Sequence, residues 1–123
     1  MARTALDLTR EELRAYRPDR MPVERQASER WERAWEVART IARLLRDEFS
    51  ATRVIAFGSL AHRAWFTAWS DIDLAAWGIP ADRFYRAVAA ATGLSSDFEV
   101  DLVDPESCRP AVRKVIEREG MDL

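Results

Sequence analysis

The longest helical pattern in the chain runs from about Ser28 to Glu48. Apolar residues recur there at intervals of three and four, and the opposite face is rich in arginine and glutamate. This spacing predicts one long amphipathic helix. Its apolar positions are Trp31, Trp35, Ala38, Ile41, Ala42, Leu45 and Phe49. Upstream, the capping-box pattern at residues 9–12 predicts a short helix over 10–17, followed by an extended connector over residues 18–22.

Three later segments have the composition of strands. Residues 53–57, 71–77 and 98–103 are short, mostly apolar and bounded by glycine, serine or proline. Helical spacing predicts a helix starting near Leu60 and two more over residues 81–92 and 109–119. The order is helix, helix, strand, helix, strand, helix, strand, helix (α-α-β-α-β-α-β-α). This order predicts an α/β (α+β) fold with a small mixed sheet flanked by helices.

Length, charge and cysteine content narrow the class of protein. With 123 residues the chain forms one domain, which we predict at residues 28–123 after an N-terminal extension at 1–27. The formal net charge of −2 gives no reason to expect a nucleic-acid partner. Cys108 is the only cysteine, which excludes an intrachain disulfide and favours a plain free thiol over a nucleophile. No apolar run is long enough for a membrane span or a leader, so we expect a cytoplasmic protein.

The turn after the first strand is the first candidate for chemistry. Gly58 and Ser59 follow a buried strand and precede a predicted helix. Such a turn offers free backbone N–H groups, a serine hydroxyl and the positive end of a helix dipole, all of which favour a phosphate. A tight turn in which Ser59 only caps the helix is the plain alternative.

Carboxylates on two predicted strands form the second candidate. Asp71 and Asp73 share one face of their strand, where they repel each other unless a cation lies between them. A solvent-exposed strand end without a ligand is the alternative. Asp101 and Glu99 share a face of the third strand. If the two strands are neighbours, three aspartates meet there and could hold two Mg²⁺ ions roughly 3.5–4 Å apart, as in phosphoryl transfer.

Together these motifs resemble a known family. Gly58-Ser59, Ser70-Asp71-Ile72-Asp73-Leu74 and Val100-Asp101-Leu102-Val103 are similar to the minimal nucleotidyltransferases of the DNA polymerase beta superfamily. The resemblance extends from about Trp31 to Leu123. It implies that Gly58 and Ser59 hold the triphosphate of a nucleotide, that Asp71 and Asp73 bind both Mg²⁺ ions, and that Asp101 binds the catalytic ion and assists deprotonation of the acceptor hydroxyl.

The resemblance also implies a substrate and a partner. Such enzymes transfer a nucleoside monophosphate, here AMP from ATP, to a hydroxyl and release pyrophosphate. Many members of this size are similar to antitoxins that modify a tyrosine of a helical HEPN toxin. Two alternatives stay open. One is a module that neutralises its partner by contact alone, and the other is transfer to a small molecule or an RNA end by a homodimer whose cleft is shared.

The spacer between the two motifs departs from the family. Family loops often continue Arg-Ala-Arg-Gly after Gly-Ser, whereas this chain has Leu60-Ala61-His62-Arg63. Arg63 is a candidate phosphate ligand, with a solvated helix face as its alternative. For His62 we expect a surface or nucleotide-contacting role rather than general base catalysis. For the aromatic residues we favour core or interface positions over stacking on a base; they are Trp65, Phe66, Trp69 and Trp77. For Asp104 we expect a place in a turn rather than a role as a metal ligand.

Overall fold

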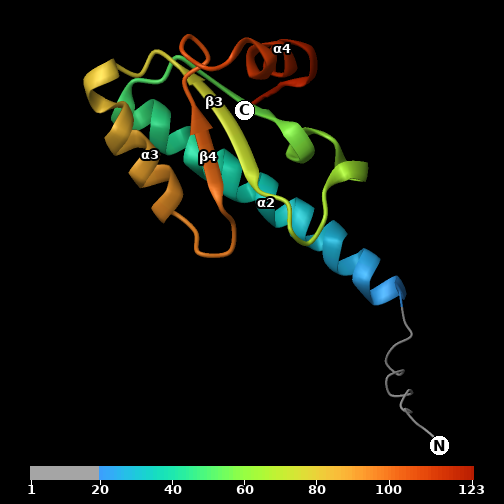
Figure 1. Cartoon of the computed structure of the whole chain (residues 1–123). Coiled ribbons are helices and arrows are strands. Elements are labelled where there is room, and N and C mark those ends of the chain that lie inside the picture. Colours follow the sequence, from blue (N-terminus) through green and yellow to red (C-terminus); the bar gives the residue numbers. More distant parts are fainter. Residues whose placement is uncertain (1–19) are drawn as a thin grey trace, which may run out of the picture. The chain divides into compact units, whose positions relative to one another are not determined.

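The computed structural model describes residues 20–123, and the helix predicted over residues 10–17 lies outside them (Figure 1). The chain divides after Arg30 into two units, and every strand belongs to the second, Trp31–Leu123. The domain boundary predicted between residues 27 and 28 stays a prediction. No helix in the described part of the chain is long and apolar enough to cross a membrane.

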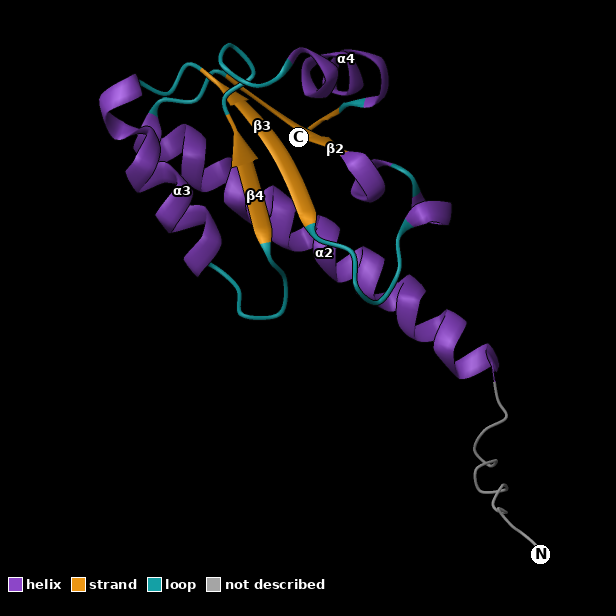
Figure 2. Ribbon diagram, in the orientation of Figure 1, coloured by secondary structure: helices purple, strands orange, loops and turns teal. Residues whose placement is uncertain are grey.

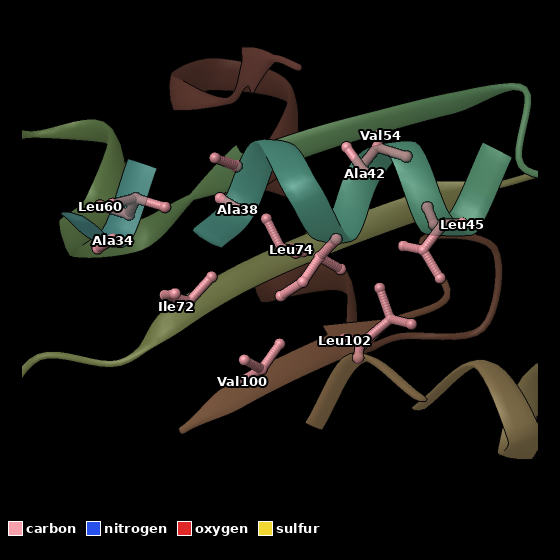
Figure 3. Packing of buried hydrophobic residues seen from close by; sticks show 14 of the residues in the cluster. Ala34, Ala38, Ala42, Leu45, Val54, Leu60, Ile72, Leu74, Val100 and Leu102 are labelled. Carbon is pink, nitrogen blue, oxygen red and sulfur yellow. The ribbon is translucent and has the colours of Figure 1, made fainter. Parts of the chain in front are cut away.

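Helix α2 (Arg20–Phe49) is the long amphipathic helix, and it begins earlier than expected. The predicted extended connector is therefore wrong at residues 20–22. Pro22 lies in the first helical turn, where its missing N–H removes no intrahelical hydrogen bond. From Trp31 onward the apolar residues on one side of the helix are buried or half-buried, as predicted. Alanines occupy several of these positions, so the helix backbone can pack close to the sheet, as Figure 3 shows for Ala34, Ala38 and Ala42.

A sheet of four strands forms the centre of the second unit, in the order β4-β3-β2-β5. Its strands are β2 (Arg53–Phe57), β3 (Ile72–Trp77), β4 (Val100–Val103) and β5 (Met121–Asp122). Strand β3 pairs antiparallel with β2 and parallel with β4, and β2 also pairs antiparallel with β5. The mixed α/β fold and the three predicted strands are confirmed, while β5 was not predicted because two residues carry no strand pattern.

The two faces of the sheet are covered by different helices (Figure 2). On one face, alternate strand residues such as Val54, Ile72 and Leu74 pack in one core with α2 and α3 (Phe84–Gly93). On the other, Ile55, Phe57 and Ala75 cluster with Ile116 of α4 (Pro110–Glu119). The period-two alternation of the strands produces this division.

The helix predicted from Leu60 is wrong. Two 3-10 turns, η1 (Gly58–Ala61) and η2 (Arg63–Trp65), follow β2 instead. A third, η3 (Ala81–Arg83), precedes α3, which starts three residues later than predicted. After Trp65 the chain turns so that Phe66, only 5% exposed, enters the main core. A continued α-helix over these residues would carry Phe66 past that position.

Candidate functional site

The candidate site lies where the end of β2 meets the beginnings of β3 and β4 (Figure 2). The registers are Phe57 opposite Asp73 and Asp73 opposite Asp101. Asp73 is thus in an inner strand, with the glycine turn following its neighbour on one side and a second carboxylate on the other. Strand pairing alone therefore brings Gly58 and Asp101, which are 43 positions apart in the sequence, to the same site.

The aspartates face the α4 side of the sheet. Ile72 and Leu74 are buried on the α2 side, so Asp73 between them points to the opposite side. In β4, Val100 and Leu102 are buried in the same way, and Asp101 between them is exposed. Asp71 precedes β3 by one residue and is exposed, whereas Asp73 is half-buried. The predicted neighbourhood of Asp101 and the Asp71–Asp73 pair is therefore present.

Asp73 carries the electrostatic signature of this neighbourhood. Partial burial, together with the negative charges of Asp101 and Asp71, raises the pKa of its carboxyl from 3.8 to about 6. Both causes disfavour the charged form. A cation bound beside the carboxylates would reverse the effect, since it would stabilise the ionised side chain.

Gly58 is required by the same contact. Its φ of +72° lies in the left-handed region that favours glycine. A Cβ at this position would lie 2.5 Å from Oδ2 of Asp73. The backbone of the turn therefore passes directly against the carboxylate, and any side chain at position 58 would displace one of them. This close approach links the two sequence motifs in space.

The donor set fits magnesium, although the carboxylates do not form a finished cage. Within residues 20–123, no group of three or more histidine, cysteine, aspartate or glutamate side chains could hold a metal ion as arranged. Mg²⁺ is commonly held by one or two carboxylates, with waters and substrate phosphates as the other ligands. Carboxylate chemistry and the mutual repulsion around Asp73 both suit a small, hard cation.

Glu99 is a fourth carboxylate that the sequence placed on the face of Asp101 without a role. Its carbonyl oxygen accepts a hydrogen bond of 2.9 Å from the N–H of Ile72. Because Ile72 pairs with Val100, the preceding residues Asp71 and Glu99 are neighbours across the two strands. Glu99 is exposed. Glu99 thus lies opposite Asp71 in the row before the Asp73–Asp101 pair, so each strand contributes two carboxylates to this edge.

The glycine turn itself is not the start of an α-helix. Turn η1 has four residues, too few to supply the helix dipole that the sequence suggested for a phosphate. The turn is fixed by other bonds. Trp31 of α2 donates from Nε1 to the Leu60 carbonyl at 3.0 Å, and the N–H of His62 donates to the Ser59 carbonyl at 3.1 Å. Backbone N–H groups and the Ser59 hydroxyl stay as the candidate phosphate donors.

Arg63 and His62 have other contacts. The Arg63 guanidinium lies over the Trp31 ring, 5.2 Å from its centroid, which directs it toward α2. Its role as a nucleotide ligand stays a prediction. His62 Nε2 lies 3.2 Å from Oε1 of Glu119 in α4, and its ring stacks on Trp65 with the centroids 4.0 Å apart. No sequence pattern predicts the contact with Glu119, because 57 positions separate it from His62.

The remaining candidates take structural positions. Phe66 is in the core, and Trp77 lies at the far end of β3, where Arg53 is 5.0 Å above its ring. The predicted turn role of Asp104 is confirmed, because its Oδ1 accepts the N–H of Glu106 at 2.9 Å. Cys108 is a free, half-buried thiol, as expected.

The fold matches that of solved toxin–antitoxin proteins. A toxin–antitoxin structure with AMP-PNP is 24% identical, with a TM-score of 0.57, and the match covers 69% of this chain and 70% of that chain. A MntA-HpeT variant with one tyrosine replaced by alanine is 28% identical over 69% of each chain, with a TM-score of 0.54. Another, with two aspartates replaced by glutamate, is 23% identical over 69% and 70% of the chains, with a TM-score of 0.54.

No protein-family model matches the sequence, and no curated protein matches it either. The structural matches show that the chain has a small nucleotidyltransferase fold similar to that in the MntA toxin–antitoxin structures.

Proposed function

We propose that this protein is a Mg²⁺-dependent nucleotidyltransferase that transfers AMP from ATP to a tyrosine hydroxyl of a partner HEPN toxin and so acts as an antitoxin. The observation that carries the proposal is the position of Asp73 between Asp101 and the backbone of Gly58. Asp71 adds a third carboxylate on the same side of the sheet. Nucleotidyl transfer requires backbone donors for the triphosphate next to carboxylates that hold the metal ions.

The solved relatives support the choice of substrate and acceptor. One of them is a toxin–antitoxin with AMP-PNP, an analogue of ATP. The variants made in two others replace one tyrosine, and two aspartates that are two positions apart. These are the residue types that the proposal assigns to the acceptor and to the Asp71–Asp73 pair.

Each side chain has a role in the proposed reaction. The acceptor oxygen attacks the α-phosphorus of ATP, the bond to the bridging oxygen of the β-phosphate breaks, and pyrophosphate leaves. Asp101 takes the proton of the acceptor hydroxyl. Gly58 and Ser59 hold the triphosphate through backbone N–H groups and the serine hydroxyl. Asp71, Asp73 and Asp101 hold the Mg²⁺ ions, which when bound neutralise the charge of the phosphates and the developing negative charge.

The test is incubation with labelled ATP, Mg²⁺ and the purified toxin encoded by the neighbouring gene. We expect label on the toxin, lost in Asp73→Ala by at least about 100-fold, because the central carboxylate has no substitute. Asp82→Ala is the matched control, since Asp82 is an exposed aspartate in η3, beyond the opposite end of β3. Equal labelling by wild type and Asp73→Ala, or none by wild type, would contradict the proposal.

The second candidate is neutralisation by contact alone, favoured by two exposed tryptophans beside the site, Trp65 and Trp69. The two functions differ in one result. Rescue of cell growth that survives both Asp71→Ala and Asp73→Ala would establish contact as sufficient. Rescue that is lost in both variants while the complex still forms would assign the antitoxin effect to transfer.

A further inference from the structure

Two tryptophans next to the candidate site are open to solvent. Trp65 is 57% exposed and Trp69 is 89% exposed, in a protein whose other large apolar side chains are mostly covered. Both lie in the spacer that leads from η1 to Asp71, the loop with short helical turns between β2 and β3 in Figure 2. We call these two indole rings the spacer surface.

The spacer holds Trp65 in a fixed position. The next residue, Phe66, is buried in the core and anchors the chain. The Trp65 ring stacks on His62, and His62 in turn is within hydrogen-bonding distance of Glu119 at the end of α4. An exposed ring would ordinarily lose rotational freedom when a partner binds it. Here the Trp65 ring is already ordered in the free protein, so binding costs less side-chain entropy.

Trp69 is held through its backbone. Its N–H donates to the Thr67 hydroxyl at 3.1 Å, and the Thr67 N–H donates to the Ser70 hydroxyl at 2.9 Å. The N–H of Ser70 donates to the Thr67 carbonyl at 3.2 Å. These bonds close a compact turn with Trp69 at its outer side. The turn leaves 89% of Trp69 exposed, so packing inside the protein does not explain the residue.

The beginnings of β3 and β4, to which the spacer leads, are acidic. Asp71, Glu99 and Asp101 are exposed, and none of their side chains has a basic partner among the side chains of residues 25–123. Tryptophan is enriched among the residues that contribute most to protein–protein affinity, where it fills a pocket on the partner from which water is excluded. Acidic groups repel nucleic-acid phosphates but attract a basic protein surface.

We propose that the spacer surface is the docking site of the acceptor protein, and that this partner presents an apolar pocket for the indoles within a basic surface. The inference rests on the proposed function, because docking beside Asp71 brings a tyrosine of the partner to the carboxylates. A partner bound at the far end of β3 would not reach them. The departure from the family pattern in the spacer thus encodes which acceptor is recognised.

The experiment compares three exposed aromatic residues in binding to the purified toxin from the neighbouring gene. Trp69→Ala is expected to raise the Kd at least about tenfold, and Trp65→Ala about fivefold, since less of its ring is exposed. Tyr85→Ala is the matched control. Tyr85 is also 89% exposed but lies in α3, so its Kd should stay within about twofold of wild type. Raising the salt concentration should weaken the wild-type complex.

Two further measurements separate this inference from the proposed function. ATP binding, titrated without toxin, should be the same in Trp69→Ala and wild type, and thermal unfolding should be unchanged because the side chain is exposed. Weakened toxin binding by Trp69→Ala supports the docking site even if the wild type transfers no AMP. Wild-type affinity in both tryptophan variants, absence of any complex, or tight binding of a single-stranded oligonucleotide that Trp69→Ala abolishes would each overturn it.

Discussion

The two faces of the sheet use the same strands for opposite purposes. On the α2 side every inward position of β3 is apolar and fully covered, as with Ile72 and Leu74, each 0% exposed. On the α4 side the apolar residues of β3 stop at Ala75, and the next positions toward the beginning of the strand are Asp73 and Asp71. One face contributes stability, and the uncovered end of the other leaves carboxylates open to solvent. Substitutions on the two faces should therefore have opposite effects.

The largest effect is expected on the covered face. Leu74→Ala removes a fully buried side chain from the core shared by α2 and the sheet. Such a cavity lowers the free energy of unfolding by about 3 kcal/mol. Chemical denaturation would measure the loss. A change below about 1 kcal/mol would show that this face is not the tightly packed one.

On the charged face we expect a stabilising substitution. The pKa of Asp73 is higher in the folded protein than in the unfolded chain, so the folded state binds the proton more tightly. The metal-free protein therefore loses stability as the pH rises from about 4 through about 6, where this carboxyl ionises. Asp73→Asn cannot ionise and should escape the loss. In a chelating buffer its Tm at about pH 8 should exceed that of wild type by about 3 °C, with no gain at about pH 4.

Asp82→Asn serves as the control for removing a negative charge, because Asp82 is exposed in η3, away from the carboxylates. Asp82→Asn should leave the change in Tm between about pH 4 and about pH 8 the same as in wild type. Addition of Mg²⁺ and ATP should then raise the Tm of wild type but not that of Asp73→Asn. If Asp73→Asn is less stable than wild type at the higher pH, repulsion among the aspartates is not the dominant effect at this face.

The smallest expected effect concerns two tryptophans one helical turn apart. Trp31→Phe removes the N–H that holds the Leu60 carbonyl at 3.0 Å, so the glycine turn becomes looser. We expect about threefold weaker ATP binding with little change in Tm. In Trp35→Phe the deleted N–H is buried and has no hydrogen-bond partner in the described part of the chain, so ATP binding should not fall, although the smaller ring leaves a cavity in the core that lowers the Tm. Calorimetric titration with ATP measures both variants, and equal weakening would exclude a specific role for the Trp31 bond.

The strands could be predicted because their information is local. The bounds of β2 and the alternation that turns Asp73 away from Leu74 are both readable from residues 53–77. The pairing of Asp73 with Asp101 needed only the assumption that their strands are neighbours. These predictions depend on period and on short-range chemistry, which the sequence contains directly.

The spacer could not be predicted in this way. Its local sequence is compatible with a helix, but distant contacts decide its path: Phe66 enters a core built by α2 and the strands, and His62 meets Glu119. Strand β5 was missed for a similar reason. Gly120, where a Cβ would collide with the Ile55 side chain, lets the chain pass close enough to pair with β2. Such contacts exist only after the fold has formed.

The inner position of β3 has a consequence for motion. The backbone of Asp73 lies between β2 and β4, so its amide is expected to exchange with solvent only when the whole sheet opens. The turn η1 and the spacer lie outside the ladder and are held by short-range hydrogen bonds and by the buried Phe66, so smaller openings suffice to expose their amides. Asp73 would then be the least mobile part of the site, and adjustment to nucleotide and acceptor would occur in the turn and the spacer. Hydrogen exchange should therefore be slower at the amide of residue 73 than at the amides of residues 60–70.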